Sequence, residues 1–438
     1  MKFKQTITSI ISNLITSLAL RDIRRRYFEL RRNLLGQDHD IHFFFQMDDP
    51  YSYLASQALE KLMHSYNINI HLHPVGEPDN NAVPERNALI DFSIKDAIKI
   101  AHYHHLDFKN NYKLPSLSKR LIALRALCFS KNRIADAQNI ARKLWSDDED
   151  ALLAMPLASE KSALETLENS STYRKKLGHY LSGMFYYNGE WYWGVDRLPY
   201  LEDRLIKLNL RKNQSAPISV FKKNAKPNLK KDLTHLTAEC FISIRSPYSY
   251  LALPEILGLS KMYRINTKIR PVMPMVMRGL EVPRVKALYI VKDAKRESHR
   301  INVPFGKIND PLGQAVLRGY SLYPYSKTKK KDGEYLLEFC RLAWSQGKDM
   351  SLEENLRTAI ENASLDWKEA KQYLDHDDWQ EELELNRLQL IKSGLWGVPS
   401  FRLTDNDNKE LFSTWGRDRI WLLTHELQHY SKPKDQGD

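Results

Sequence analysis

The sequence has few cysteines, and no two of them lie close together. Its 438 residues include three, Cys128, Cys240 and Cys340. An odd number without a Cys-x-x-Cys motif argues against a disulfide framework and favours a reducing, cytoplasmic compartment. All three fall in segments with strand or helix patterns, which predicts buried and unreactive thiols.

Long hydrophobic runs are also missing, since no segment reaches the roughly 18 apolar residues that a membrane span needs. The N-terminal segment has apolar residues at helical spacing, then an arginine cluster, which predicts an amphipathic basic helix. Ser, Thr and Asn interrupt the apolar positions and no small-residue cleavage site follows, which argues against a signal peptide. We expect this helix to pack on the body of the protein in preference to a membrane surface. The apolar residues are Phe3, Ile7, Ile10, Ile11, Leu14, Ile15 and Leu18, and the arginines are Arg21, Arg24, Arg25 and Arg26.

Positive charge is in moderate excess. The chain has 66 basic and 54 acidic residues, a net charge of +12. Such a balance could attract nucleic acid, a membrane surface or small anions. No familiar nucleic-acid-binding motif accompanies it, so we expect a solvated basic surface and no nucleic-acid partner. The spacing of His102, His104 and His105 does not suit a zinc site, and no metal site is predicted.

The chain contains an internal repeat. Residues 49–55 (DPYSYLA) match residues 246–252 (SPYSYLA) at six of seven positions, and the offset, 246 minus 49, is 197. Several matching blocks in the same order indicate two copies of one domain. The other blocks are 66–75 with 263–272 and 95–97 with 292–294 at the same offset, and 193–197 with 415–419 later in each copy.

Each copy has the same predicted order of elements. A strand, a helix that begins at Pro-Tyr-Ser-Tyr and a second strand form a β-α-β unit, which implies parallel strands. A long helical stretch follows, and each copy ends in a β-hairpin and a helix. This order is that of a thioredoxin-like α/β domain interrupted by helices. The predicted strands are 42–47, 68–74, 184–187 and 190–193 in the first copy, and 240–245, 265–272, 400–403 and 410–413 in the second.

These patterns divide the chain into five segments. We predict an N-terminal helix (1–38), a degenerate thioredoxin-like domain (39–210), a linker (211–236), a thioredoxin-like domain with the functional site (237–432) and a tail (433–438). The linker is rich in Lys, Asn, Ser and Pro, as a surface connection should be.

Ser246 is the first candidate functional residue. It follows an apolar strand and precedes Pro247, so it should be the N-cap of a helix. A hydroxyl at the positive end of a helix dipole can hold an anion or a thiolate. A plain N-cap would explain the same residues, and the other candidates in the second copy favour the functional interpretation.

Those other candidates follow in chain order. Lys286 lies at the head of a predicted helix, where its ammonium could meet a carboxylate. Pro399 stands just before a strand, and in a thioredoxin-like domain such a proline is cis. That geometry would leave the N–H and C=O of Val398 free to pair with an extended peptide. Asp418 offers a carboxylate suited to an amine.

The second copy resembles the 2-hydroxychromene-2-carboxylate isomerase and kappa-class glutathione transferase family, in the DsbA-like branch of the thioredoxin fold. The resemblance implies an α/β protein of two tandem DsbA-like thioredoxin-fold domains, each with a helical insertion between its β-α-β and β-β-α halves. The first copy follows through the repeat. The matching motifs are 246–252, 269–272, 283–289, 397–401 and 415–419, in family order.

The resemblance also implies a cofactor, glutathione, and a small-molecule electrophile as partner. The thiolate would add reversibly to a conjugated substrate, as in an isomerase, or displace a leaving group, as in a transferase. The implied roles are Ser246 on the glutathione sulfur, Val398 before cis-Pro399 on the cysteinyl backbone, Lys286 on a carboxylate, and Asp418 with the backbone of Gly416 and Arg417 on the γ-glutamyl end.

The sequence departs from this family in two places. Residues 273–280 run almost straight to Pro283 without the glycine-asparagine pair of typical members, so glutathione could bind more weakly or another thiol could replace it. The methionines of this stretch could line a substrate pocket or form a core patch. In the first copy, Asp49 replaces the serine and Gly183 the proline. We expect a degenerate copy that pairs with the second as an intramolecular pseudo-dimer.

Two other functions remain open. A DsbA-like thiol-disulfide oxidoreductase needs cysteines where Ser246 and Ser249 stand, so the chain could belong to that family only without its redox chemistry. A non-catalytic thioredoxin-like binding module would keep the fold and lose the reaction.

Overall fold

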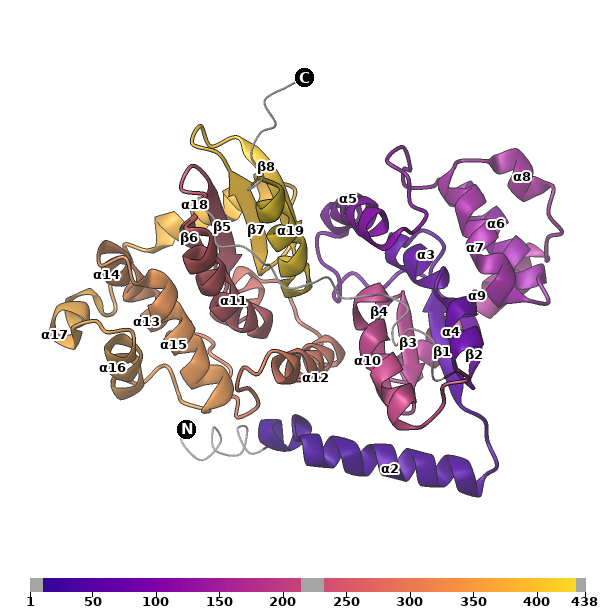
Figure 1. The fold of residues 1–438 in the computed structure, drawn as a ribbon, viewed down its shortest axis with the longest axis horizontal. Coiled ribbons are helices and arrows are strands. Elements are labelled where there is room, and N and C mark those ends of the chain that lie inside the picture. The colour runs from indigo at the N-terminus through magenta and orange to yellow at the C-terminus, as the bar shows by residue number, and fades with distance from the viewer. Residues whose placement is uncertain (1–10, 214–231, 431–438) are drawn as a thin grey trace. The chain divides into compact units, whose positions relative to one another are not determined.

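The computed structural model describes residues 11–213 and 232–430, drawn in Figure 1. The chain divides into two compact units, one of residues 21–223 and one of residues 224–438 with residues 1–20. Each unit holds a four-stranded sheet, with strand orders β2-β1-β3-β4 and β6-β5-β7-β8. In each sheet the first two strands along the chain are parallel and the other pairs are antiparallel. The predicted fold of two tandem DsbA-like thioredoxin-type domains is confirmed.

The first unit contains the helical insertion between its two halves, as predicted. Its hairpin has the predicted bounds, because Asn188-Gly189 forms the tight turn between the strands. The helix after β1 ends at Ser56 and a second helix begins at Leu59, where the repeat predicts one helix. The elements are β1 (Asp40–Phe45), α3 (Pro50–Ser56), α4 (Leu59–Ser65), β2 (Asn69–Pro74), α5 (Arg86–His104), α6 (Leu117–Phe129), α7 (Arg133–Trp145), α8 (Glu149–Leu153), α9 (Glu160–Lys176), β3 (Met184–Tyr187), β4 (Glu190–Trp193) and α10 (Gly194–Lys207).

The second unit has the same order with a longer insertion. Its first helix is continuous and carries Pro254 inside it. The elements are β5 (Thr237–Ile242), α11 (Pro247–Tyr263), β6 (Asn266–Pro271), η1 (Met275–Arg278), α12 (Arg284–Arg300), α13 (Gln314–Ser321), α14 (Tyr323–Thr328), α15 (Asp332–Ser345), α16 (Glu353–Asn362), α17 (Trp367–Ala370), η2 (Lys371–Tyr373), α18 (Gln380–Lys392), β7 (Ser400–Thr404), β8 (Glu410–Trp415), η3 (Arg417–Arg419) and α19 (Ile420–Tyr430).

Equivalent hydrogen bonds join the first helix of each unit to the helix that opens the insertion. In the first unit Tyr51 Oη donates to Asp96 Oδ2 at 2.9 Å, and in the second Tyr248 Oη donates to Asp293 Oδ2 at 2.7 Å. Both partners differ by the same 197 residues (248 minus 51 and 293 minus 96). The sequence repeat therefore corresponds to a repeat of contacts.

The three cysteines are free, and two of them lie in the core of the second unit. Cys240 on β5 and Cys340 on α15 are buried, and burial raises the pKa of both thiols above the ordinary range. Cys128 on α6 is half-buried, and burial again raises its pKa. A thiol that stays protonated is a poor nucleophile.

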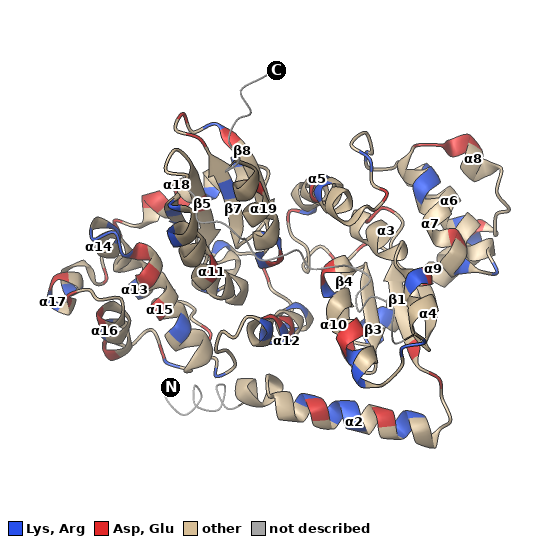
Figure 2. Ribbon diagram, in the orientation of Figure 1, with Lys and Arg blue, Asp and Glu red and all other residues tan. Residues whose placement is uncertain are grey.

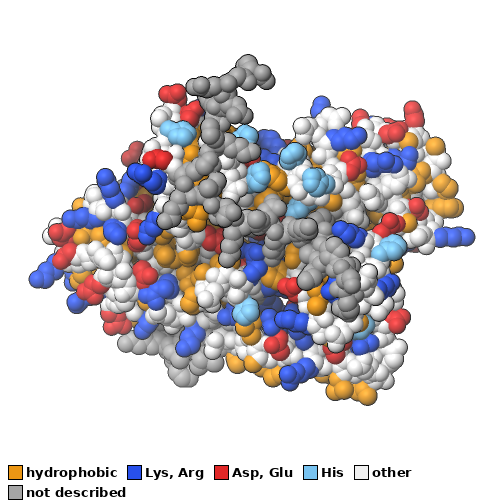
Figure 3. Space-filling model, viewed as in Figure 1, with side chains coloured by type: hydrophobic (Ala, Val, Ile, Leu, Met, Phe, Trp, Pro, Cys, Tyr) orange, Lys and Arg blue, Asp and Glu red, His pale blue; other side chains and the backbone are white. Residues whose placement is uncertain are grey.

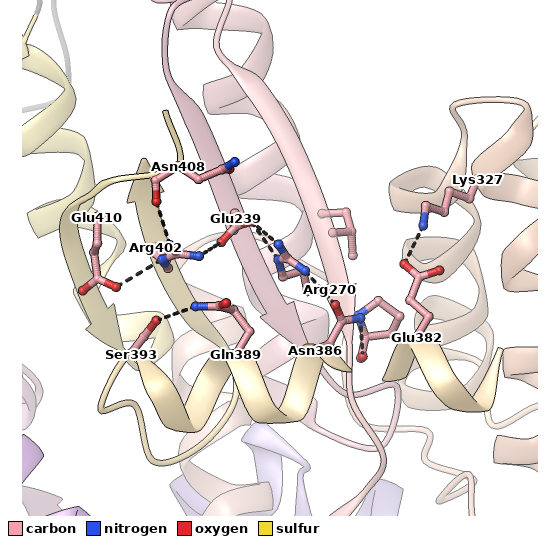
Figure 4. A network of polar contacts seen from close by, with 12 residues as sticks. Glu239, Arg270, Lys327, Glu382, Asn386, Gln389, Ser393, Arg402, Asn408 and Glu410 are labelled. Atoms are coloured by element: carbon pink, nitrogen blue, oxygen red, sulfur yellow. Dashed lines mark hydrogen bonds and ion pairs between the residues drawn. The ribbon is translucent and has the colours of Figure 1, made fainter. Parts of the chain in front are cut away.

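The face of the second sheet beneath α18 carries a buried ion network, shown in Figure 4. Glu239 on β5 accepts from Arg402 Nη1 at 2.7 Å and from Arg270 Nε at 2.8 Å. Asn386 on α18 accepts from Arg270 Nη1 at 2.9 Å, and Arg402 Nε also reaches Glu410 at 3.1 Å. Glu239 is thus the shared anion of two arginines, and the network connects all four strands of the sheet to the covering helix.

The N-terminal segment contacts the second unit through side-chain hydroxyls. Ser12 Oγ accepts from the Ile308 N–H at 3.0 Å, and Thr16 Oγ1 donates to the Gly306 carbonyl at 3.2 Å. Of the described part of the predicted packing face, Leu18 is half-buried and Ile11, Leu14 and Ile15 are exposed, so the expectation of packing on the body is wrong for these last three residues. Phe3, Ile7 and Ile10 lie outside the described residues. Among the described helices, none combines the length and the apolar character needed to cross a membrane.

Loss of the Glu239 carboxylate should lower the free energy of unfolding. In Glu239→Ala, the buried Arg402 and the half-buried Arg270 lose their common partner, and we expect a loss of about 3–5 kcal/mol in the free energy of unfolding. The exposed pair Glu384–Arg387 on α18 gives the matched control, because Glu384→Ala removes a surface ion pair worth less than about 1 kcal/mol. Urea unfolding of both variants measures the difference, and equal losses would contradict the assigned role of Glu239.

Candidate active site

Ser246 is the N-cap of α11, as predicted. Its Oγ accepts from the Ser249 N–H at 3.2 Å and donates to the Val398 carbonyl at 3.4 Å. The residue takes an extended conformation, with φ −99° and ψ 116°, which lets the chain leave the sheet and turn into the helix. The hydroxyl therefore sits where the positive end of a 17-residue helix meets the segment before β7.

The peptide bond between Val398 and Pro399 is cis, as predicted. Ser400 Oγ donates to the Gly397 carbonyl at 2.6 Å, which closes the turn ahead of β7. Within the described residues the Val398 N–H makes no hydrogen bond, and Val398 is half-buried. An extended peptide could pair with this N–H without displacing a bond of the protein.

Lys286 lies in the first turn of α12 and is buried. Its Nζ stands 5.4 Å from the centre of the Trp396 ring, within the range of a cation–π contact. Burial lowers the pKa of Lys286 to about 8, because a charged ammonium loses hydration there. An incoming carboxylate would place an opposite charge beside the ammonium and stabilise its charged form.

Gly416 links the cis-proline segment to η3. Its N–H donates to the Pro399 carbonyl at 2.9 Å, and its own carbonyl accepts from the Arg419 N–H at 3.0 Å. Its φ of +106° is a conformation that L residues avoid, and an added Cβ would collide with Asp418 Oδ1. Because Gly416 has no side chain, the Asp418 carboxylate can fold back over the turn. The Asp418 side chain is 16% exposed.

The Arg417 side chain has a structural function that the sequence did not indicate. Its guanidinium pairs with Glu297 on α12 and with Glu255 on α11, and the arginine is buried. These ion pairs hold η3 against the two helices that carry Lys286 and Ser246. The predicted role of the Arg417 backbone stays a prediction.

The structure thus brings the predicted residues together around the cis-proline. Ser246 contacts Val398, Pro399 contacts Gly416, and Lys286 approaches Trp396, two residues before Val398. The ring of Trp396 packs edge-on against Trp415 at 5.1 Å. We did not identify Trp396 from the sequence, although it directly precedes the Gly397-Val398-Pro399 motif.

Residues 273–280 form a short turn with η1 in place of a longer loop. Met273, Met275 and Met277 are half-buried, so they are neither a closed core patch nor fully exposed. No cluster of three or more potential metal ligands occurs among residues 11–213 and 232–430.

The equivalent position in the first unit is already filled by a carboxylate. Asp49 accepts from the N–H groups of Tyr51 and Ser52 and from the hydroxyls of Ser52 and Ser182, at 2.6–3.1 Å. Burial raises the pKa of Asp49, although these hydrogen bonds favour its charged form. Gly194 N donates to the Gly183 carbonyl at 2.7 Å, just as Gly416 does to Pro399, so Gly183 takes the place of the cis-proline.

Comparisons with known proteins show which families the chain is similar to. Residues 237–428 match the family model described as DSBA-like thioredoxin domain. Glutathione S-transferase kappa 1 of Homo sapiens is 25% identical over 209 residues, which cover 44% of this chain and 90% of that protein. The Rattus norvegicus protein of the same name is 25% identical over 206 residues, 43% of this chain and 89% of the relative. The matches confirm the resemblance predicted from the second copy.

Among solved structures, 2-hydroxychromene-2-carboxylate isomerase is 19% identical, with a TM-score of 0.37. The match covers 44% of this chain and 95% of that one.

Substitution of Gly416 tests the local geometry. Gly416→Ala forces a Cβ into Asp418 at a positive φ, so we expect a lower melting temperature, from a loss of roughly 1–3 kcal/mol. Gly258, inside α11, has open space around its Cα and no positive φ. Gly258→Ala should therefore raise the melting temperature, with a gain of about 0.5–1 kcal/mol. Calorimetry of both variants checks the opposite signs.

Lys286 should make stability depend on pH. Its folded pKa of about 8 lies below the unfolded value of about 10.4, so the buried charge destabilises the fold fully below pH 8. As the pH rises from about 8 to 10.4, the unfolded chain keeps the proton and this cost disappears. Lys286→Met should stabilise the protein at pH 7 and lose that advantage near pH 10. Exposed Lys261→Met is the control, and melting curves that show the same pH response for both would refute the argument.

Proposed function

We propose, from the premise that residues 237–428 belong to the DSBA-like thioredoxin domain family, that the second unit binds glutathione and uses its thiol against an electrophilic, conjugated small molecule. The observation that carries the proposal is the Ser246 hydroxyl, which lies at the start of α11 and within hydrogen-bond reach of the Val398 carbonyl. The Ser246 hydroxyl can redirect its donated hydrogen bond from the Val398 carbonyl to a sulfur while it still accepts from the Ser249 N–H.

The residues around the cis-proline fit a short γ-linked peptide. The Val398 N–H can donate to a backbone carbonyl of the cysteinyl unit, which directs the thiol toward Ser246. Lys286 supplies a cation to a carboxylate, and Asp418 supplies an anion to the γ-glutamyl amine, with the backbone of Gly416 and Arg417 beside it. The shortened stretch 273–280 offers fewer contacts to the ligand, so we expect an affinity weaker than that of a member with the longer loop.

Two effects at Ser246 would favour the thiolate. Its O–H donates a hydrogen bond to the charged sulfur, and the dipole of α11 adds a partial positive charge at the same point. Glutathione supplies the nucleophile, and the chain orients it and lowers its pKa. Reversible addition to a conjugated bond would make the protein an isomerase, and displacement of a leaving group would make it a transferase.

Direct disulfide exchange at this site has no support, because positions 246 and 249 are both serine. Ser249 is buried, and its Oγ accepts from the Ser243 N–H at 3.2 Å, which ties the helix to the strand end. A non-catalytic binding module is the second candidate, favoured by the first unit, where Asp49 already replaces the serine.

Calorimetric titration with glutathione tests the proposal. Wild type should bind with a measurable heat, and Ser246→Ala should retain the fold while the bound thiol becomes a weaker acid. Loss of a hydrogen bond to a charged group costs about 1.5–3 kcal/mol, so the pKa of bound glutathione should rise by about 1–2 units. Ultraviolet absorbance of the thiolate, followed against pH, measures that rise.

Matched variants separate the possible outcomes. Ser260→Ala, at the far end of α11, removes a hydroxyl that donates to the Ile265 carbonyl and should leave the thiol pKa unchanged. Absence of heat at millimolar glutathione in wild type would overturn the proposal. Binding with an unshifted thiol pKa in wild type would favour the non-catalytic module instead.

A further inference from the structure

The helix α2 (Leu18–Leu34) contacts the first unit through its polar side. Arg25 donates from Nε and Nη2 to both carboxylate oxygens of Glu190 at 2.7 Å, and Arg24 Nη2 donates to the Gly189 carbonyl at 2.7 Å. A Cβ added to Gly189 would lie 2.6 Å from the Phe28 ring, so the helix approaches the β3–β4 turn closely at this point. The arginines and the half-buried Phe28 hold this helix in place, and the main apolar stripe does not.

The apolar side of α2 points the other way. No residue of the helix is buried, and at 3.6 residues per turn Ile23 and Leu30 lie opposite Arg25. A helix on a globular domain normally turns its apolar stripe inward, so the usual arrangement is reversed. The stripe repeats every three or four residues, at Leu20 (43% exposed), Ile23 (59%), Tyr27 (58%), Leu30 (60%) and Leu34 (77%).

Positive charge borders this stripe. The helix contains six arginines and two acidic residues, a net charge of +4 (6 minus 2). Arg26 and Arg31 are exposed and lie on opposite edges of the stripe, Arg26 on the edge of Leu30 and Arg31 on the edge of Tyr27. Figure 2 shows the blue bands along α2, and Figure 3 shows hydrophobic and basic side chains side by side where the helix lies.

A second copy of this chain does not suit the same surface. The spacing of three and four residues is that of a coiled-coil seam, with Arg26 and Arg31 at the flanking positions. In a parallel pair, Arg26 of one helix would face Arg31 of the other, and both are cations. An apolar surface edged by cations is instead complementary to a layer that is apolar inside and anionic outside.

We infer that α2 binds the surface of a membrane that contains anionic lipids. The stripe from Leu20 to Leu34 inserts at the boundary between headgroups and acyl chains, and Arg26 and Arg31 meet lipid phosphates. The helix lies in the plane of the interface and does not cross the bilayer. The inference is independent of the reaction at Ser246.

Sedimentation with vesicles of stated composition tests this inference on the full chain. Wild type should bind vesicles of phosphatidylcholine with phosphatidylserine, bind pure phosphatidylcholine weakly, and dissociate as salt rises from about 0.1 to 0.5 M. Ile23→Ser with Leu30→Ser should abolish binding. Arg26→Gln with Arg31→Gln should weaken binding to the anionic vesicles by at least about tenfold.

Matched controls come from other exposed helices. Leu385→Ser with Leu388→Ser removes two exposed leucines from α18, and Arg357→Gln with Lys371→Gln removes two exposed cations. Both should bind vesicles as wild type does. All these side chains are exposed, so melting temperatures should stay close to that of wild type.

Three results would overturn the inference. The first is the absence of wild-type binding to anionic vesicles, and the second is equal loss of binding in the α18 control. The third is a dimer by sedimentation equilibrium that Ile23→Ser with Leu30→Ser converts to a monomer, because the stripe would then bind a second copy.

Discussion

The Ser246 hydroxyl lies between two backbone groups, the Ser249 N–H that it accepts from and the Val398 carbonyl that it donates to. The arrangement of the site follows from this double contact. It ties the start of α11 to the cis-proline segment, and the bond from Gly416 to Pro399 extends the tie to η3. Three segments that are distant in sequence are therefore held in one line of hydrogen bonds. The same hydroxyl is an ordinary helix cap and a possible thiol partner, since one geometry satisfies both.

Equivalent positions on the first two strands of the two sheets are occupied by side chains of different chemistry. Glu239 and Arg270 form an ion pair in the second unit, and 197 residues earlier stand His42 and His73, whose Nδ1 and Nε2 lie 3.0 Å apart. Burial lowers the pKa of His42, and it lowers that of His73 to about 4, so both imidazoles are neutral in the fold. Because the unfolded chain binds these protons near pH 6.5, the contribution of the pair is complete above that pH and is lost as the pH falls toward 4. At these two positions the first unit thus has neutral imidazoles where the second has an ion pair, at the cost of acid sensitivity.

Sequence patterns predicted the strands and their order well, because alternation, tight turns and the repeat are local signals. They also placed Ser246, Val398 and Pro399 in one site through a resemblance that spans the second copy. What they could not predict depends on tertiary packing. Periodicity shows that the N-terminal helix has an apolar side, but only contacts such as Arg25 with Glu190 show which side faces the protein. The burial of Lys286 is likewise invisible in sequence, since lysine is usually exposed. For the break of the first helix at Ser56 we find no sequence signal.

The first unit lacks the backbone geometry that holds the cis-proline in the second unit. Gly183 has a φ of +65°, whereas a proline ring fixes φ near about −65°, so a proline cannot occupy this position without a change of the backbone. A Cβ at Gly183 would lie only 3.2 Å from the Asp49 carboxylate, which occupies the donors of the helix start. Asp49→Ser alone would leave the Gly183 backbone unchanged, and Gly183→Pro alone would meet the Asp49 carboxylate. No single substitution at these two positions therefore reproduces the geometry of the second unit in the first.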